Sequence, residues 1–211
     1  MNNRKQSPLK KLNLGCGNKP KEGWINLDRV ALPGVDVVHD MTNVPLPFPD
    51  NYFDAIYTTE TLSHSPNIRK TLKEFFRILK PGGRVAFFEY ALAPDENFSA
   101  WERKMLDLVI EGSAMMGLKD FRHDKFTEFM QSVGFKNVKE LNITENIRPS
   151  FYRLHKLSIW PYKLVKLLFL QKFFINITAG YEYYKMADKG LICYCIFTGN
   201  KPTNIKKQHQ T

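Results

Sequence analysis

A short apolar segment that runs directly into a glycine turn constrains the fold of this chain more than any other feature. Residues 11–14 lead into Gly15-Cys16-Gly17, and a second apolar segment, residues 24–27, ends in the carboxylate of Asp28. In an α/β sheet, such glycines let the backbone approach a nucleoside, and the acid accepts hydrogen bonds from ribose hydroxyls. The third glycine of a dinucleotide fingerprint is missing. The turn therefore indicates a nucleoside site only in combination with the segments that follow it.

Four later segments continue the pattern in order. Residues 35–40 end in an acid, residues 53–58 begin with Phe-Asp, residues 59–64 read Thr-Glu-Thr-Leu-Ser-His, and residues 79–83 read Leu-Lys-Pro-Gly-Gly. With the glycine turn, these motifs resemble those of the class I S-adenosylmethionine (SAM)-dependent methyltransferases of the small-molecule type, the methyltransferase type 11-like family. The resemblance covers the chain to about residue 138 and says little about residues 145–190.

The fold class that follows is α/β. The resemblance implies a three-layer sandwich around a Rossmann-like, seven-stranded, mostly parallel sheet with the order 3-2-1-4-5-7-6. Apolar segments predict strands at residues 11–14, 24–27, 35–39, 53–58, 84–90, 138–143 and 191–198, and helical periodicity predicts helices at residues 67–80, 99–116 and 124–133. Only ten residues separate Gly17 from Asp28, so a turn or two is expected where the family has a full helix.

We expect one methyltransferase domain over residues 11–200, with a flexible lead at 1–10 and a flexible tail at 201–211. Residues 145–190 are predicted to form a helical lid inserted before the last strand. Its lysines suit one helical face, and another face, expected to cover an apolar acceptor, comprises Leu157, Trp160, Leu164, Leu167 and Leu168.

Composition bears on the partners and the location of the chain. The formal net charge is +10, which suits nucleic acid, an anionic membrane or simple solubility. Residues 146–181 contain no acid, so peripheral contact with an anionic membrane through residues 148–184 stays open, whereas no specific nucleic acid is predicted. The three cysteines lack metal-ligand spacing, so no metal is expected. The sequence shows no secretory leader and no long apolar run, which favours a cytoplasmic location. The sequence does not predict the oligomeric state.

The resemblance implies SAM as the cofactor. Asp28 would hold the ribose, Asp40 would face the adenine amine, and Met41 would pack beside the ring. The full predicted cofactor set is Asn13, Gly15, Cys16, Gly17, Asp28, Asp40, Met41 and Thr59.

Glu60 and His64 are the predicted catalytic residues, because they follow the fourth strand on the methyl-transfer side. Imidazole titrates near neutrality and can orient or deprotonate an acceptor hydroxyl. A hydrogen-bonded loop histidine is the alternative, since Ser63 replaces the carboxylate of the family's Leu-Glu-His segment. The segment is also distantly similar to the Glu-Ala-Thr-Cys-His of sterol C-methyltransferases, where a carboxylate faces a carbocation.

The predicted function is SAM-dependent methyl transfer to a small, largely apolar or lipid-like acceptor, because aromatic residues are abundant in residues 148–184. Two alternatives stay open. An RNA methyltransferase would suit the charge, and a non-catalytic SAM- or nucleotide-binding protein would suit the short first connection and Ser63.

Overall fold

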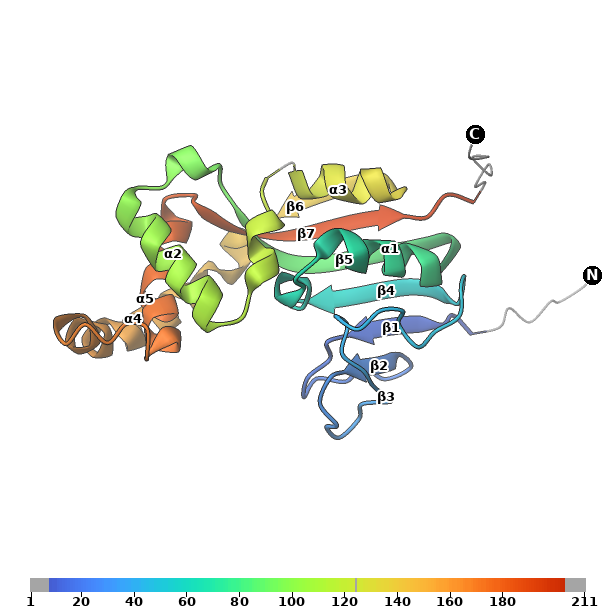
Figure 1. Cartoon of the computed structure of the whole chain (residues 1–211), viewed down its shortest axis with the longest axis horizontal. Coiled ribbons are helices and arrows are strands. Elements are labelled where there is room, and N and C mark those ends of the chain that lie inside the picture. The colour runs from blue at the N-terminus through green and yellow to red at the C-terminus, as the bar shows by residue number, and fades with distance from the viewer. Residues whose placement is uncertain (1–7, 124, 204–211) are drawn as a thin grey trace, which may run out of the picture.

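The computed structural model describes residues 8–123 and 125–203, which form one sheet with associated helices (Figure 1). The strands are β1 (Lys11–Leu14), β2 (Ile25–Asp28), β3 (Val37–Val38), β4 (Phe53–Thr59), β5 (Leu79–Leu92), β6 (Lys136–Asn142) and β7 (Ile192–Asn200). The helices are α1 (Ile68–Ile78), α2 (Ala100–Gly112), α3 (Lys125–Val133), α4 (Thr144–Leu167) and α5 (Ile175–Asp188). Residues 1–7 of the predicted lead, residues 204–211 of the predicted tail and the predicted helix start at residue 124 lie outside the described residues.

The strand order is β3-β2-β1-β4-β5-β7-β6, which confirms the predicted topology. The first five strands in sequence pair in parallel, and β7 is antiparallel to both β5 and β6. Because parallel strands end at one edge of a sheet, the segments that follow β1, β2, β3 and β4 meet there.

Some element boundaries differ from the predicted ones. β3 has two residues instead of five, and the carboxylate of Asp36, just before it, accepts the amide of Asn26 at 2.7 Å. The second predicted helix ends at Gly112 instead of residue 116. Ala114 there adopts a left-handed φ of 54°, which a right-handed helix cannot continue.

One face of the sheet carries the core beneath α1 and α3. Phe87 of β5 is fully buried there, and its ring lies 5.6 Å from that of Phe75 in α1 and 6.5 Å from that of Phe126 in α3, centroid to centroid. Burial of side chains of this size stabilises the fold by roughly 1.5–3 kcal/mol each. This layer therefore holds the strand ends in register.

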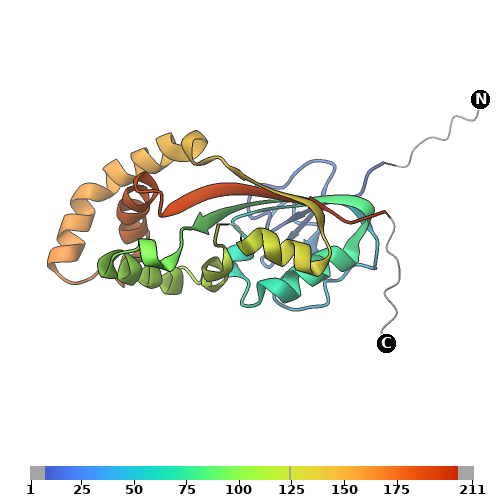
Figure 2. The same cartoon turned by 90° about the horizontal axis from the view of Figure 1, so that it is seen from above.

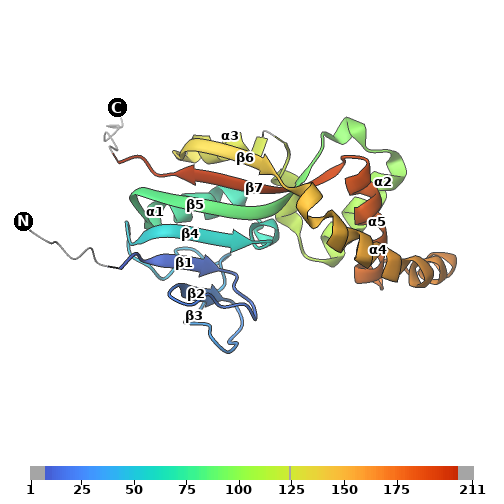
Figure 3. The same cartoon turned by 180° about the vertical axis from the view of Figure 1, so that it is seen from behind.

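The opposite face has less helical cover. The β1–β2 connection contains only turns, as its length predicted, and the β2–β3 connection is a loop. Within the described residues, no helix lies over β1 and β4 on this side (Figure 3). Lys11, Trp24 and Tyr57 line a groove of about 420 Å³ on this face, where the expected fold would place its second helical layer.

Helices α4 and α5 lie between β6 and β7 in the chain and project beyond the end of the sheet (Figure 2). α4 is curved and contains Pro149 and Pro161, each of which lacks the amide hydrogen that a helix interior uses. The hydroxyl of Tyr162 in α4 donates to the buried carboxylate of Glu182 in α5, which ties the two helices together.

Candidate functional site

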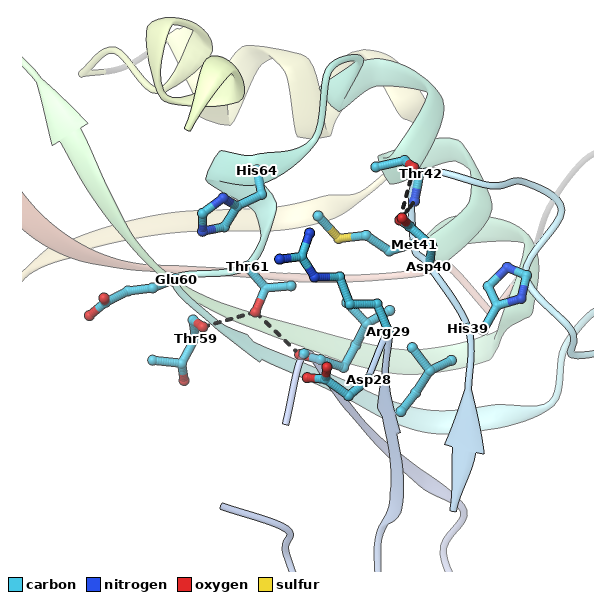
Figure 4. Close-up of a pocket in the computed structure, with 13 residues that line it drawn as sticks. Asp28, Arg29, His39, Asp40, Met41, Thr42, Thr59, Glu60, Thr61 and His64 are labelled. Atoms are coloured by element: carbon cyan, nitrogen blue, oxygen red, sulfur yellow. Dashed lines mark hydrogen bonds between the residues drawn. The ribbon is translucent and has the colours of Figure 1, made fainter. Parts of the chain in front are cut away.

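The carboxyl ends of the parallel strands surround a cavity of about 270 Å³ (Figure 4). This is the edge at which open parallel sheets bind ligands. Seven of the ten predicted site residues line it, namely Gly15, Asp28, Asp40, Met41, Thr59, Glu60 and His64.

The glycine turn brings backbone up to this cavity. Gly15 has a φ of 69°, and a Cβ added there would lie 2.2 Å from Oγ1 of Thr61, so no other residue fits. The amide of Gly17 donates to Oδ2 of Asp28 at 2.8 Å, and the amide of Val30 donates to Oδ1 at 3.0 Å. Each carboxylate oxygen can accept a second hydrogen bond. Asp28 is thus held by two amides and can still accept two hydroxyl groups.

Asp40 and Met41 form the far side of the cavity. Oδ1 of Asp40 accepts the amide and the hydroxyl of Thr42, both at 2.8 Å. These bonds lower the pKa of Asp40, and the bond from the amide has the larger effect. The carboxylate therefore stays charged at neutral pH. Its Oδ2 is an acceptor suited to an amine, and Met41 is a buried apolar wall beside it.

Arg29 is a lining residue that the sequence analysis missed. Its side chain extends from the end of β2 into the cavity (Figure 4). Guanidinium is always charged and also stacks on aromatic rings, so it suits either an anionic or a flat ligand group. The available signal was its position, one residue after the acid that ends the second strand.

Three predicted cofactor residues do not line the cavity. Asn13 is buried, and its side-chain amide donates to Oδ1 of Asn26 at 2.9 Å, which joins β1 to β2. Cys16 is also buried, with Sγ 3.7 Å from the carbonyl oxygen of Gly17. Gly17 is half-buried and contacts Asp28 through its amide, so these three residues support the turn and Asp28 without lining the cavity.

Glu60 lies directly after β4 in a conformation that is rare for residues other than glycine. Its φ is 50°, and its amide donates to the carbonyl of Phe88 at 2.8 Å. Such a backbone costs on the order of 1–3 kcal/mol and persists only where surrounding contacts enforce it. Its carboxylate accepts the hydroxyl of Tyr194 at 3.0 Å, which fixes the charge at the cavity edge.

His64 is oriented by one backbone contact. Its Nδ1 lies 3.1 Å from the carbonyl oxygen of Ala114. Because a carbonyl can only accept, we assign the proton to Nδ1. Nε2 of the neutral ring then has a free lone pair and can accept a proton.

Glu89 lies beneath this segment and is fully buried. Its Oε1 accepts the amides of Thr61 and Leu62 at 2.8 and 2.7 Å, and so shapes the turn that carries Glu60 and His64. Burial raises the pKa of Glu89 to about 8, against the opposing effect of these amides. The side chain is therefore mostly neutral at pH 7. Glu89 supports the site without lining it.

A second cavity of about 340 Å³ adjoins the first, and Glu60 and His64 line both. Its walls are largely apolar and aromatic and come from β5, α2, α4 and α5, including Tyr90, Val109, Phe151, Leu154, Ala179 and Tyr183. The two shared residues therefore stand between a polar cavity and an apolar one.

Three tyrosines surround Glu60 in this region. Burial, followed by the charge of Glu60, raises the pKa of Tyr90, Tyr183 and Tyr194, so all three rings stay neutral. The buried hydroxyl of Tyr183 has no hydrogen-bond partner among the described residues. The second cavity therefore suits a mostly apolar molecule with a polar group within reach of this hydroxyl.

The predicted apolar face of the lid does not line the second cavity. Leu157 and Trp160 are each 76% exposed, and Leu164, Leu167 and Leu168 are also exposed. The buried residues of α4, including Ser158, Tyr162 and Val165, lie on the opposite side of the helix. The expectation that the most apolar stripe turns inward was wrong, because α5 packs against the smaller and more polar stripe. Phe151 and Leu154 contribute to the cavity instead.

A family model described as a methyltransferase domain matches residues 12–87. Two curated relatives extend the similarity. A SAM-dependent Diels-Alderase of Talaromyces variabilis is 29% identical over 158 residues, which cover 73% of this chain and 53% of the relative. The sterol 24-C-methyltransferase of Schizosaccharomyces pombe is 30% identical over 135 residues, which cover 64% of this chain and 33% of the relative. The chain thus matches about half or less of the length of these relatives.

The fold is also found in solved structures. The geranyl diphosphate C-methyltransferase of Streptomyces coelicolor, solved with Mg²⁺, geranyl diphosphate and S-adenosylhomocysteine, superposes with a TM-score of 0.64 at 12% identity, over 92% of this chain and 72% of that one. These findings confirm the recognition of a class I methyltransferase fold. They give no support to the RNA alternative.

Proposed function

We propose that this chain, whose residues 12–87 match a methyltransferase domain, binds SAM in the first cavity and methylates an apolar, lipid-like acceptor in the second. One observation carries the proposal. Glu60 and His64 line both cavities, so a group bound at the polar side and a group bound at the apolar side would meet at these two residues.

The residues of the first cavity fit SAM. Gly15 lines this cavity, and the absence of a Cβ there lets Thr61 pack against the turn. Asp28 would hold the ribose hydroxyls, Asp40 the adenine amine, and Met41 would pack beside the ring. When bound, SAM would supply a methyl group attached to a sulfonium, and S-adenosylhomocysteine would be the leaving group.

The chain itself would contribute alignment and proton transfer. His64 holds its Nδ1 on a carbonyl, so Nε2 would take the proton of an acceptor that must lose one. Glu60 places a negative charge beside neutral tyrosines at the edge of the second cavity, where it would attract any positive charge that develops on the acceptor. Tyr183 would donate its free hydroxyl to a polar group of the acceptor.

A second candidate function is favoured by one relative. The Diels-Alderase of Talaromyces variabilis is described as SAM-dependent. A chain of this fold could therefore bind SAM and catalyse ring formation in an apolar substrate. Formation of S-adenosylhomocysteine separates the two functions.

The test uses the whole chain with SAM carrying a labelled methyl group and a total lipid extract. We expect label in the organic phase and an equal amount of S-adenosylhomocysteine, and at SAM concentrations that do not saturate the variant both should be reduced in Asp28→Ala. SAM binding with no S-adenosylhomocysteine would contradict methyl transfer. In that case a lipid product altered without a gain of methyl would favour ring formation.

The exposed apolar residues of the α4–α5 segment point to a membrane as the source of the acceptor. Within the described residues, no helix is long and apolar enough to cross a bilayer. The apolar tip, as we call this group, is 58–84% exposed and consists of Leu157, Trp160, Leu164, Leu167, Phe169 and Phe173. Exposed apolar groups of this extent mark interaction sites.

The charges around the apolar tip favour an anionic bilayer over a protein partner. Four lysines lie 4.3–4.9 Å from aromatic rings at the tip or beside it, namely Lys156, Lys163, Lys166 and Lys172. Between Asn146 and Tyr181 the sequence has no acid. Interleaved lysines and large apolar side chains are typical of segments that lie in a membrane interface. We therefore propose that the tip inserts and that the second cavity receives its acceptor from the bilayer.

Vesicle sedimentation tests this contact. Replacing Leu157 with Ser and Trp160 with Ala should weaken binding to vesicles that contain phosphatidylserine by about 3 kcal/mol, roughly 100-fold. Leu141→Ser is the matched control, because Leu141 is 60% exposed on the distant strand β6. Binding should also fall with added salt. Equal binding by the double variant and the control, or no binding at low salt, would exclude the membrane role.

A further inference from the structure

Four side chains of the kinds that bind metals gather on the α3 side of β6 and β7. One ligand atom each of His123, Glu140 and Cys195 lie within 4.8 Å of one another. Nδ1 of His123 is 2.8 Å from Oε1 of Glu140, and Sγ of Cys195 is 3.3 Å from the same oxygen. Cys193 lies two residues earlier on the same face of β7.

The sheet topology brings these residues together from three separate segments. β6 and β7 pair Glu140 with Phe197 and Asn142 with Cys195, so Glu140 lies diagonally across from Cys195 on one face. The amide of His123 donates to the carbonyl of Leu92 at 3.2 Å, which anchors the imidazole beside the strands. None of the four residues lines either of the two cavities described above.

Burial makes this combination unusual. Cys195 is fully buried and Cys193 is 8% exposed, while the side chains of His123 and Glu140 are 31% and 13% exposed. The cluster thus has a closed sulfur side and an opening to solvent at the imidazole. A metal ion could enter there and meet two sulfurs, one nitrogen and one oxygen.

We propose that His123, Glu140, Cys193 and Cys195 bind one divalent transition-metal ion of the zinc class. Two thiolates select against Mg²⁺ and Ca²⁺, which prefer oxygen, and a mixed sulfur, nitrogen and oxygen set suits tetrahedral Zn²⁺. Bond lengths of about 2.0–2.3 Å to zinc place ligand atoms roughly 3.5 Å apart. The ligand atoms of His123, Glu140 and Cys195, which lie within 4.8 Å of one another, are already near this spacing, and Cys193 would complete the set from its place two residues before Cys195.

Binding exchanges protons for the metal. Each cysteine sulfur loses its proton to solvent as its bond to the ion forms, and His123 must be neutral at the ligating nitrogen. The charge of the two thiolates and of Glu140 is then balanced by the divalent ion and by solvent. No electron transfer is involved.

Cobalt spectroscopy tests the proposal on the full chain, kept reduced and stripped of metal with a chelator. Added Co²⁺ should produce a thiolate-to-cobalt charge-transfer band at one ion per chain, together with the intense visible bands of tetrahedral cobalt, and Zn²⁺ should abolish both. Cys193→Ser, Cys195→Ser and His123→Ala should each weaken binding by more than the roughly 10–100-fold that loss of an outer-shell partner costs. Cys16→Ser is the control for the remaining thiol, and it should leave the bands unchanged.

Circular dichroism and SAM titration identify variants that merely fail to fold. The absence of a thiolate band at saturating Co²⁺ in a folded wild-type chain would overturn the proposal, and the four side chains would then be a hydrogen-bonded cluster only. Bands that survive in both folded Cys193→Ser and Cys195→Ser would also overturn it.

Discussion

Asp28 connects the glycine turn to the cavity, because its two oxygens accept the amides of Gly17 and Val30 and keep lone pairs for a ligand. We predict that Asp28→Ala loses a paired, charge-assisted contact to the ribose of SAM. The expected loss is about 2–3 kcal/mol, or roughly 30–150-fold in affinity. Calorimetric titration with SAM measures it. Unchanged affinity in a folded variant would remove Asp28 from the cofactor site.

His64 should act in turnover and not in cofactor binding. With Nδ1 held by Ala114, Nε2 is available as a base, and general-base catalysis contributes roughly 10²–10⁴-fold. His64→Gln should therefore lower kcat within that range and leave SAM affinity almost unchanged. His155→Gln is the control, because His155 stacks on Tyr181 and lines neither cavity. A His64→Gln variant with normal kcat and weakened SAM binding would contradict the role.

Glu89 should make stability depend on pH. Burial raises its pKa in the folded chain to about 8 from a usual value of 4.5, so the folded state binds more protons than the unfolded state between these values. The free energy of unfolding should therefore fall as pH rises from about 5 to about 8. Glu89→Gln keeps the acceptor for the amides of Thr61 and Leu62 and removes the ionisation. Its pH dependence should be flatter than that of the wild type.

Urea unfolding at about pH 5 and about pH 8 measures this difference. The exposed Glu96→Gln is the matched control and should behave like the wild type. A Glu89→Gln variant that loses as much stability as the wild type over this range would mean that Glu89 is charged in the folded chain.

The places of single residues were predictable where a motif marks a strand end. Asp28 is the last residue of β2, Asp40 lies two residues after β3 and Glu60 directly follows β4, and all three line the cavity. Asn13 does not line the cavity, because side chains alternate along a strand and the sequence does not say which face of the first strand meets the cavity. Glu89 was left out of the predicted site because it acts through backbone amides of another segment.

At the scale of elements, the length of a connection predicted whether it contains a helix. The ten residues between Gly17 and Asp28 predicted the absence of a helix, which the turns of this segment confirm. The orientation of α4 was not predictable in the same way. Its most apolar stripe faces solvent, because the side of α4 that carries Tyr162 packs against α5. There the hydroxyl of Tyr162 donates to the carboxylate of Glu182.

Tyr162→Phe should therefore loosen the α4–α5 pair. Loss of the hydroxyl leaves the carboxylate of Glu182 buried without this donor, which costs about 1–3 kcal/mol. Hydrogen exchange should quicken in α4 and α5 and stay unchanged in the sheet. Tyr152→Phe is the control, since the Tyr152 ring is 43% exposed. Equal exchange in the two variants would show that the buried bond does not hold the helices.

At the scale of the whole molecule, the core, the two cavities and the apolar tip occupy different regions around the sheet. The core lies under α1 and α3, and the two cavities lie at the carboxyl edge. The apolar tip lies on α4 and the turn after it, and α4 projects beyond that edge (Figure 2). The second cavity is lined in part by α4, the helix that carries most of the tip. A membrane contact at the tip would therefore bring lipid close to the acceptor cavity.

The central claim is that SAM and the acceptor meet at Glu60 and His64. A crystal structure of the chain with S-adenosylhomocysteine tests it most directly. We expect adenosine between Asp28 and Asp40, with the sulfur facing Glu60 and His64 and the apolar cavity beyond them. A ligand bound elsewhere, or a sulfur that faces away from the second cavity, would contradict it.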